Sequence, residues 1–367
     1  MKRIISSLAF AFMFLVFAQA QSQGNFLIQS QAQISVKLQE LNDNFSNYEL
    51  FSLNTKKVYD DFTRQGNIGY TDVMLDGEKI TLSWADYQLC SPTYKLIAMD
   101  QNGEREVESK LKTYQGKVLN DPKANVAITV SDEFFSLMIE RNGVNYYIEP
   151  AERFNPSAAG LFVMYKNTDY IGKKGFSCAH TETQQAMQQV AENEERAAPT
   201  CYRVQWAIAS DHLMYAKYSN SITQVEARTL SVLNSAAVNY FGTFAFDYKF
   251  KVEIQKVSTC SNCLNVSSST DADAIIQTFT QYGNSNGFGN DVDYDIGQFY
   301  TSRDITSGGG NGVIGYASVG AVCTNARYQI IEDFSTNADY MRVVVADRKS
   351  TRLNSSHVLR SRMPSSA

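Results

Sequence analysis

Few residues in this sequence have the types and the spacing that metal chemistry requires. A His-Glu-x-x-His pair, which holds two imidazoles one helical turn apart around zinc with the glutamate as general base, is absent from the chain. Two histidines, His180 and His212, lie in the body of the sequence, and His357 lies near its end. Because His212 follows Asp211 at the predicted end of a strand, we interpret it as a structural histidine. The chain as given contains no predicted catalytic residue and no predicted metal-ligand set.

Cys260 and Cys263 form a Cys-x-x-Cys pair between a predicted strand and a predicted helix. A structural zinc site needs a second pair of ligands, and none remains in the sequence. A redox role requires a thioredoxin-like context, which this segment meets only loosely. We therefore predict a structural disulfide between the two cysteines.

Two further local patterns are weak. Asp291, Asp293 and Asp295 resemble a calcium loop, but the glycine of an EF-hand is missing and Ser302 stands at the position of its last glutamate. The glycine-rich residues 308–312 lack the following Lys-Ser/Thr of a phosphate loop, so they favour a turn before an edge strand. Local motifs alone give no active site.

Length and composition set the class of protein. The chain has 367 residues, of which 44% are hydrophobic and 19% charged, as in globular proteins of one or two domains. Its formal net charge is −5, and no dense Lys/Arg stretch lies in its body. A nucleic acid is therefore not expected as the main partner.

Residues 1–20 have the pattern of a secretion signal. Lys2 and Arg3 precede an apolar run over residues 4–17, and residues 18–20 form a small-x-small cleavage signal. The run is shorter than the roughly 20 residues that span a bilayer. We predict a cleaved signal peptide and a secreted, extracellular protein with no membrane span after cleavage. Export permits disulfides among the six cysteines.

The next part of the chain is rich in predicted strands. Residues 21–180 contain short apolar or alternating runs separated by Asp-Gly and Asn-Gly dipeptides, which are typical of hairpin turns. Residues 181–200 are rich in Gln and Glu and have no apolar stripe. We expect them to form a solvated, acidic connector that a protease could reach.

Strands and helices alternate over residues 201–346. Ser221 and Gln224, for example, form a capping box at the start of a predicted helix. Strand–helix–strand order implies right-handed crossovers between strands of one sheet. We therefore expect an α/β fold with a twisted, mostly parallel sheet and helices, in which residues 313–322 form an edge strand.

The last part of the chain, residues 347–367, changes abruptly to an Arg/Ser-rich composition. Residues 347–357 and 360–367 match the translation of a common short-read sequencing adapter, in one frame and at the right separation. We interpret 347–367 as an adapter artefact with no packed structure, and we expect the natural sequence to break off near Ala346.

Several segments, taken in order, resemble one family. Residues 202–218 resemble the opening strand and first helix of the adamalysin/reprolysin metalloproteases, which are metzincins. Residues 293–297 and 315–323 resemble two later strands, the second of which lies along the substrate cleft in that family. Residues 114–118 and 145–150 resemble the inhibitory propeptide of the same family.

The resemblance implies a secreted zinc metalloendopeptidase. Residues 21–180 would be its β-rich propeptide, and residues 201–346 the N-terminal part of its α/β metzincin-like catalytic domain. In that family the helix entered by residues 343–346 continues into the His-Glu-x-x-His motif, so the zinc ligands are expected after Ala346. A zinc-bound water would attack a peptide carbonyl, with the glutamate as general base. The fragment lacks these ligands and is expected to be inactive.

The same resemblance implies how substrates bind. A protein or peptide substrate would pair as an extra strand along the exposed edge of residues 313–322. The residues expected to contact it through backbone groups are Ile314, Gly315, Tyr316 and Ala317. A fully paired interior strand is the competing interpretation.

Cys178 is a candidate for a latency switch, because a thiolate can occupy the zinc position that catalysis needs for water. This resembles the cysteine switch of the family, although Ala179 stands where glycine is usual. A disulfide from Cys178 to Cys201 or to Cys90 is the alternative. In the resembled family, Cys323 pairs with a cysteine beyond the present end.

Two other functions stay open. The protein could be an exported, β-rich binding or adhesion protein without catalysis, or a degenerate protease relative that kept the fold for binding. The coding sequence downstream of codon 346 separates these alternatives from a protease.

Overall fold

The computed structural model describes residues 26–28, 39–171, 177–181, 201–238, 247–307, 310–311, 313–318 and 321–353. The predicted signal peptide and residues 182–200 of the predicted connector lie outside the described residues. We call residues 26–181 the N-terminal half of the protein and residues 201–353 its C-terminal half.

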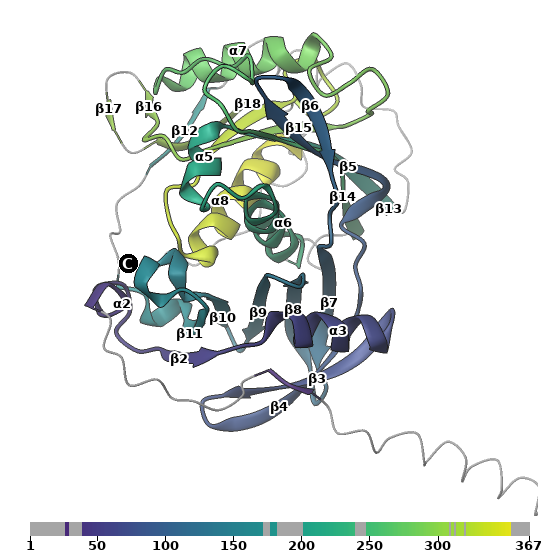
Figure 1. Cartoon of the computed structure of the whole chain (residues 1–367), viewed down its shortest axis with the longest axis vertical. Helices are drawn as coiled ribbons and strands as arrows, with labels where there is room; N and C mark the ends of the chain where they lie inside the picture. The colour runs from purple at the N-terminus through teal and green to yellow at the C-terminus, as the bar shows by residue number, and fades with distance from the viewer. Residues whose placement is uncertain are drawn as a thin grey trace, which may run out of the picture.

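The described strands gather in two large sheets with helices between them (Figure 1). The helices α6 (Ile222–Val238) and α8 (Ala338–Leu353) lie between the sheets, and α7 (Ala272–Asn284) covers the opposite face of the second sheet. The shorter elements are α2 (Gln39–Asn44), α3 (Thr55–Gln65), α5 (His212–Lys217), η1 (Ala151–Arg153), η2 (Pro156–Ala158) and η3 (Asn167–Asp169).

The first sheet comes entirely from the N-terminal half. Its order is β1-β3-β4-β7-β8-β9-β10-β11-β2, and every neighbouring pair is antiparallel except β1 with β3. The strands are β1 (Phe26–Leu27), β2 (Glu49–Ser52), β3 (Ile68–Leu75), β4 (Glu78–Asp86), β7 (Lys112–Val118), β8 (Asp121–Val130), β9 (Phe135–Arg141), β10 (Val144–Pro150) and β11 (Leu161–Lys166).

Tight turns close two of the hairpins in this sheet, as the dipeptides predict. Asp76 and Gly77 join β3 to β4 with φ of 51° and 79°, and Asn142 and Gly143 join β9 to β10 with φ of 53° and 78°. Positive φ at both turn residues matches the right-handed twist of the flanking strands. These residue types tolerate that conformation, so the hairpin predictions are confirmed.

The second sheet combines strands of both halves. Its order is β12-β18-β19-β15-β13-β14-β5-β6, and a separate pair is formed by β16 and β17. The strands are β5 (Cys90–Asp100), β6 (Gly103–Val107), β12 (Ser177–Thr181), β13 (Cys201–Ser210), β14 (Asp247–Ser258), β15 (Ile296–Thr301), β16 (Thr306–Ser307), β17 (Gly310–Asn311), β18 (Val313–Ser318) and β19 (Tyr328–Glu332).

The prediction of an α/β metzincin-like fold with a mostly parallel sheet is wrong for this chain. Antiparallel pairs outnumber parallel pairs among the described strands, because hairpins connect most neighbours in the first sheet. The second sheet is mixed, with antiparallel pairs at β18–β19 and β5–β6. The alternation of strands and helices along 201–346 gives no information about the N-terminal half, whose strands supply most of the antiparallel pairs.

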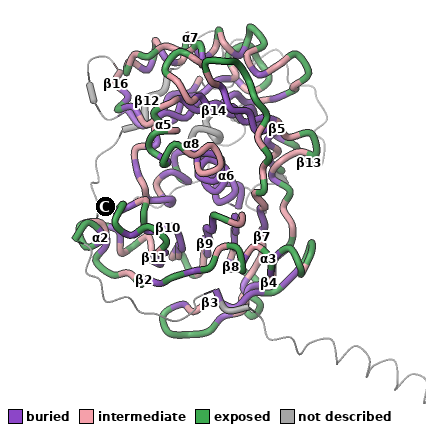
Figure 2. Tube along the Cα trace, viewed as in Figure 1, coloured by how far each residue is buried: buried purple, intermediate pink, exposed green. Residues whose placement is uncertain are grey.

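Apolar side chains fill both sides of the second sheet and the interior of the first. One cluster lies on the α6 and α8 side and includes Trp206 and Leu230, and another lies on the α7 side and includes Phe279. On the first sheet, Phe62 of α3 stacks on Trp84 of β4, with ring centroids 4.5 Å apart. Figure 2 shows the buried trace concentrated along α6 and the strands beside it.

The ends of the helices follow local sequence. The Ser221 hydroxyl accepts a hydrogen bond from the Gln224 amide at 3.3 Å, which confirms the predicted cap of α6. The helix α7 is capped by Asp271, whose side chain accepts a hydrogen bond from the Ala274 amide. The backbone of α8 continues past Ala346 to Leu353, and residues 354–367 lie outside the described part. The expectation that the tail does not pack stays a prediction.

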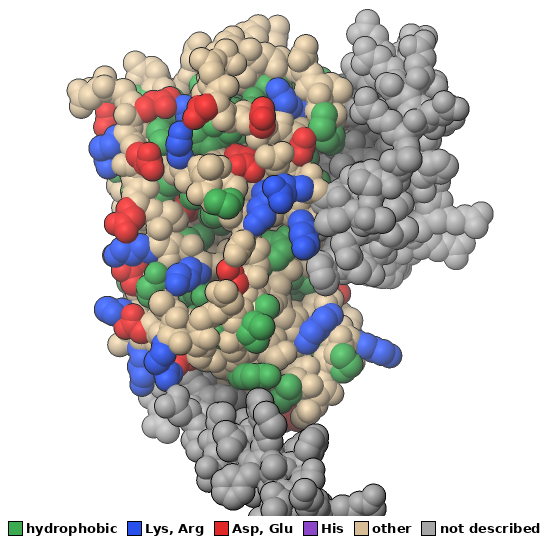
Figure 3. Space-filling view, turned by 90° about the vertical axis from the view of Figure 1, so that its right-hand side faces the viewer, with side chains coloured by type: hydrophobic (Ala, Val, Ile, Leu, Met, Phe, Trp, Pro, Cys, Tyr) green, Lys and Arg blue, Asp and Glu red, His purple; other side chains and the backbone are tan. Residues whose placement is uncertain are grey.

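Charged side chains of both signs are interspersed on the face shown in Figure 3, so this face offers no surface of a single sign.

Among the described helices, none combines the length and the hydropathy that crossing a bilayer requires.

Candidate functional site

The predicted substrate strand is β18, and both of its sides are paired. On one side β19 runs antiparallel to it, with Tyr316 opposite Ile330. On the other side β12 runs parallel to it, with Ala179 opposite Tyr316 and His180 opposite Ala317. The expectation that residues 313–322 form the sheet edge is therefore wrong in this structure, because a segment of the same chain lies outside β18.

The four residues expected to contact substrate lie together in β18. Ile314 is 2% exposed, Tyr316 7% and Ala317 0%, and Gly315 is also buried. The Ile314 side chain belongs to the apolar cluster on the α6 and α8 side, whereas the Tyr316 side chain belongs to the cluster on the α7 side. Any partner along this strand would therefore meet backbone groups rather than these side chains.

Cys178 lies in β12, the strand that covers β18. The register between the two strands shifts between Ser177 and Ala179, so the irregularity falls at Cys178. Its side chain lies outside the described residues. Cys90 is a free, partly buried thiol, so the alternative disulfide from Cys178 to Cys90 is absent. Cys260 and Cys263 form a disulfide, which confirms that prediction.

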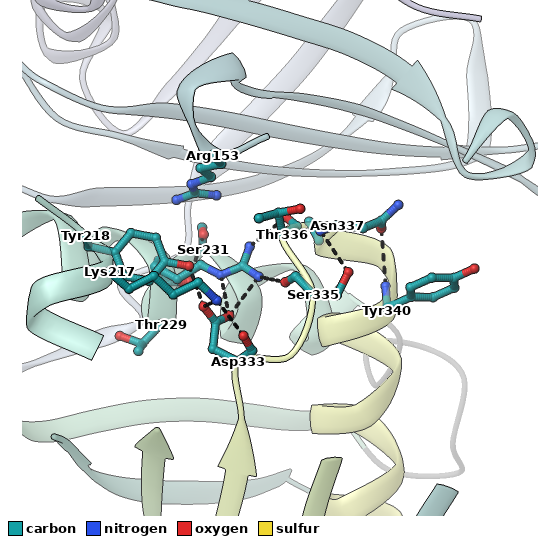
Figure 4. A network of polar contacts seen from close by, with 12 residues as sticks. Arg153, Lys217, Tyr218, Thr229, Ser231, Asp333, Ser335, Thr336, Asn337 and Tyr340 are labelled. Atoms are coloured by element: carbon teal, nitrogen blue, oxygen red, sulfur yellow. Dashed lines mark hydrogen bonds and ion pairs between the residues drawn. The ribbon is translucent and has the colours of Figure 1, made fainter. Parts of the chain in front are cut away.

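A buried ion pair fixes the loop between β19 and α8. The Arg228 guanidinium of α6 donates to Asp333 from Nε at 3.0 Å and from Nη2 at 2.9 Å, and it donates to the Ser335 carbonyl at 2.6 Å. The Arg228 side chain is 1% exposed and that of Asp333 0%. In Figure 4 dashed contacts reach Asp333 from the side of Lys217 and Tyr218, and a separate dashed contact reaches Ser335 of the loop.

Two further residues of the C-terminal half complete the surroundings of Asp333. The Tyr218 hydroxyl donates to Oδ2 at 2.6 Å, and the Lys217 ammonium lies 2.7 Å from the same oxygen. Burial alone raises the pKa of Asp333, but the charges of Arg228 and Lys217 outweigh it and hold the pKa well below its usual range. Asp333 is therefore an anion at every physiological pH.

A glutamate of the first sheet reaches the same region. The Glu149 carboxylate, which is 0% exposed, accepts from Arg153 at 2.9 Å and from the Tyr165 hydroxyl at 2.5 Å. It also accepts from the Ala338 amide in the first turn of α8 at 3.4 Å, and it lies 3.7 Å from Arg228. A carboxylate near the first turn of a helix stabilises the positive end of the helix dipole.

The first turn of α8 has two more polar supports. The Asn337 side chain accepts from the Asp339 amide at 2.8 Å and acts as the helix cap. The Asp339 carboxylate accepts from the Tyr147 hydroxyl at 2.6 Å and from the Asn145 amide group at 2.9 Å. The first sheet therefore positions the start of the helix that the resemblance connects with the zinc motif.

Sequence reasoning missed this network. Arg228 and Asp333 are 105 residues apart, and nothing in the local pattern pairs them. A usable signal was present, because Arg228 and Glu226 interrupt the apolar positions of a helix that is buried from Val225 to Val238. Charged residues in a fully buried helix require partners from elsewhere in the chain.

Two of the three aspartates in the weak calcium-loop candidate are engaged in other contacts. Asp291 pairs with Lys95 at 3.1 Å, and Asp295 accepts from the Gln205 amide at 2.8 Å and from the Cys323 thiol at 3.1 Å. Within the described residues no three His, Cys, Asp or Glu side chains are grouped so that they could hold a metal ion. This part of the chain does not fit a zinc site.

A shallow polar hollow of about 360 Å³ lies beside the end of α7. Its polar lining includes the side chains of Asn284, Asn286, Asp293, Asn325 and Arg327. The Arg327 guanidinium is held over the Tyr294 ring at 4.4 Å.

No protein-family model matches this sequence. Among solved structures, it is similar to the crystal structure of metalloproteinase-II from Bacteroides fragilis, with a TM-score of 0.46 and 12% sequence identity. The match covers 84% of this chain and 87% of that chain.

Proposed function

We propose that this chain is part of a secreted zinc-dependent endopeptidase, in which the N-terminal half is an inhibitory propeptide and β18 is the strand that binds substrate. The proposal combines the ordered resemblance of the sequence with the geometry around β18. The zinc requirement comes from the resemblance alone, since the described residues supply no ligand set.

The observation that carries the proposal is the pairing of β12 with β18. An extended segment lies along Val313–Ser318 and meets that strand through main-chain registers such as His180 with Ala317. Main-chain pairing gives affinity without requiring a particular side-chain sequence, which suits an enzyme that binds extended peptides. A substrate would replace β12 at this edge in the mature enzyme.

The support of α8 fits the same proposal. A metal site needs ligands held in a fixed geometry, and the contacts of Arg228, Asp333 and Glu149 hold the first turn of α8 and the loop before it. Zinc, when bound, would polarise the peptide carbonyl or an attacking water. In this proposal Arg228, Asp333 and Glu149 hold α8 in place.

Latency by Cys178 is a proposed feature of the same site. The backbone of β12 brings Cys178 to the outer side of β18, beside the proposed substrate position. The Cys260–Cys263 disulfide is of a kind that persists in oxidising compartments, which supports export.

The test begins with the coding sequence downstream of codon 346. We expect a His-Glu-x-x-His motif, and the completed proform is then expressed with and without the substitution Cys178→Ser. Peptide cleavage that appears early in the Cys178→Ser proform and is abolished by a chelator supports both zinc and the switch. Absence of the motif from the gene would refute the protease and leave an exported binding protein. A Cys178→Ser proform as silent as the wild type, with Cys178 disulfide-bonded in mass mapping, would refute the switch alone.

A further inference from the structure

The N-terminal half adds strands to both ends of the second sheet. The inner strands of this sheet, β14, β13, β15, β19 and β18, come from the C-terminal half. At one end β12 pairs with β18, and at the other end the β5–β6 hairpin pairs with β14. In Figure 1 the β5 and β6 ribbons, coloured as early sequence, lie beside the green strands of the C-terminal half.

The β5 strand is part of the core on both faces of that sheet. Its pairing with β14 runs from Ile254 opposite Lys95 to Ser258 opposite Met99. Leu96, 1% exposed, belongs to the same apolar cluster as Trp206, and Met99 belongs to the cluster with Phe279. Because neighbouring residues of a strand point to opposite faces, one strand closes both cores.

Buried polar contacts join the halves at two further places. The Tyr94 hydroxyl of β5 donates to the Glu226 carboxylate of α6 at 2.9 Å. The Asn234 side chain of α6, 0% exposed, donates to the Ile128 carbonyl at 2.9 Å and to the Thr129 hydroxyl at 3.2 Å, both in β8 of the first sheet. Together with the contacts of Glu149 and Asp339, these bonds cover the length of α6 and the start of α8.

We propose that the N-terminal half occupies a docking surface on the C-terminal half. This surface consists of the outer edge of β14 and the faces of α6 and α8. A cut in the connector would therefore leave the two pieces together as a noncovalent complex. Separation would expose an unpaired strand edge on β14 and apolar side chains of two cores, which is unfavourable in water. The cut gives the N-terminal piece a free end but removes none of these contacts.

Regulation of the enzyme, if the proposed function holds, would then take more than one step. Cutting the connector would not by itself clear the second sheet, so the enzyme would need a further step that removes or degrades the N-terminal piece. The association itself is independent of catalysis, so its measurement stays valid if the chain proves to have no peptidase activity.

The first experiment cuts the full chain at a defined place. A recognition sequence for a site-specific protease replaces residues within 183–198, and completeness of the cut is read on a denaturing gel. Size-exclusion chromatography with light scattering then gives the native mass. We expect one peak with the mass of the uncut protein containing both pieces. A peak of the N-terminal piece alone, at micromolar concentration, would overturn the proposal.

Two matched substitutions show whether β5 carries the association. Leu96→Lys places a charge in the shared core, and Leu119→Lys makes the same change at a residue that is 53% exposed in the N-terminal half. We expect the cut Leu96→Lys protein to lose its N-terminal piece during chromatography and the cut Leu119→Lys protein to retain it. Equal retention in both would contradict the role of β5.

A second measurement covers the case in which Leu96→Lys fails to fold. The sequence has 2 tryptophans, and Trp84 lies in the first sheet whereas Trp206 lies in the second. The variants Trp84→Phe and Trp206→Phe each leave one reporter, and in each variant urea unfolding is followed by both fluorescence and circular dichroism. We expect the two signals to change together in both variants, because one cooperative unit unfolds. A fluorescence transition separated from the circular dichroism transition would show that the halves are independent and would overturn the proposal.

Discussion

At the scale of single residues, the side chains that matter most are charged groups without access to water. Arg228 and Asp333 are buried almost completely and satisfy each other through two hydrogen bonds. Replacing such a pair by apolar groups can be neutral, but removing one partner leaves a buried charge uncompensated. The pair therefore tests how strongly the start of α8 depends on electrostatics.

The substitution Asp333→Ala is expected to lower the free energy of unfolding by about 3–5 kcal/mol, because the Arg228 guanidinium loses its main anion. The matched control is Asp60→Ala, which removes an exposed pair with Lys56 at 2.6 Å. That change is expected to cost less than about 0.5 kcal/mol. Urea unfolding of both variants measures the difference, and equal losses would show that the buried pair has no special weight.

At the scale of secondary-structure elements, helix caps and a disulfide-closed loop stabilise the fold separately from the apolar cores. The cap of α8 is formed by Asn337, which is 1% exposed, and the Cys260–Cys263 disulfide holds the connection between β14 and α7. Each feature is local in sequence, so each can be removed without changing the sheets.

The substitution Asn337→Ala is expected to destabilise the protein by about 1–2 kcal/mol, because the first turn of α8 loses its side-chain acceptor. Asn290→Ala is the control, since Asn290 is exposed and caps no helix. Thermal unfolding compares the two. An Asn337→Ala variant as stable as the control would mean that Glu149 alone satisfies the helix start.

Removing the disulfide in the double variant Cys260→Ser/Cys263→Ser is expected to cost about 2 kcal/mol, since the closed loop is short and restricts the unfolded chain little. Cys323→Ser serves as the control, because Cys323 is a free, exposed thiol whose hydrogen bond to Asp295 a hydroxyl can replace. Stability is measured by urea unfolding without reductant. A double variant with the same free energy of unfolding as the control would show that the disulfide constrains neither the folded nor the unfolded chain.

At the scale of the whole molecule, the two halves meet through buried groups that titrate. Burial raises the pKa of Glu226 from the usual 4.5 to about 7, and hydrogen bonds from Ser109 and Tyr94 only partly offset it. Burial raises the pKa of the nearby Cys90 thiol, and the Glu226 carboxylate raises it further, whereas the Lys251 ammonium opposes the shift. Burial likewise raises the pKa of Glu332 to about 7, and its partners include the Ile305 amide.

A raised carboxyl pKa makes the folded state bind more protons than the unfolded state between the two pKa values. The contribution of Glu226 to the free energy of unfolding is therefore highest below pH 4.5 and falls as the pH rises to about 7. The substitution Glu226→Gln keeps the hydrogen-bonding groups without the charge. It is expected to raise the free energy of unfolding at pH 8 by about 3 kcal/mol and to leave it nearly unchanged at pH 4.

Urea unfolding of Glu226→Gln and wild type from pH 4 to pH 8 measures this effect. A residual fall of stability in the variant is expected from Glu332, which is less buried. Parallel curves for the two proteins would show that Glu226 is already charged in the folded state and that Tyr94 and Ser109 stabilise the anion.

What the sequence determined by itself was local. The Asp-Gly and Asn-Gly hairpins, the Ser221 cap of α6 and the Cys260–Cys263 disulfide depend on residues close together in the chain, and each is present in the structure. The resemblance also placed Ile314–Ala317 in one strand, which is β18. Backbone preferences and short loops act over a few residues, so such features can be read without knowing the partners.

Only the tertiary structure decided which strands share a sheet and which charges meet. The predicted boundary at residue 180 separates the halves along the chain, yet β5 and β12 pair with β14 and β18 of the other half. The fold prediction was wrong for another reason, because the hairpins of the first sheet make antiparallel pairs the majority. Pairings of this kind depend on burying both faces of a strand, and a strand's own sequence is compatible with more than one neighbour. In the same way, Arg228 required a buried anion, but only packing of α6 against the loop after β19 made Asp333 that anion.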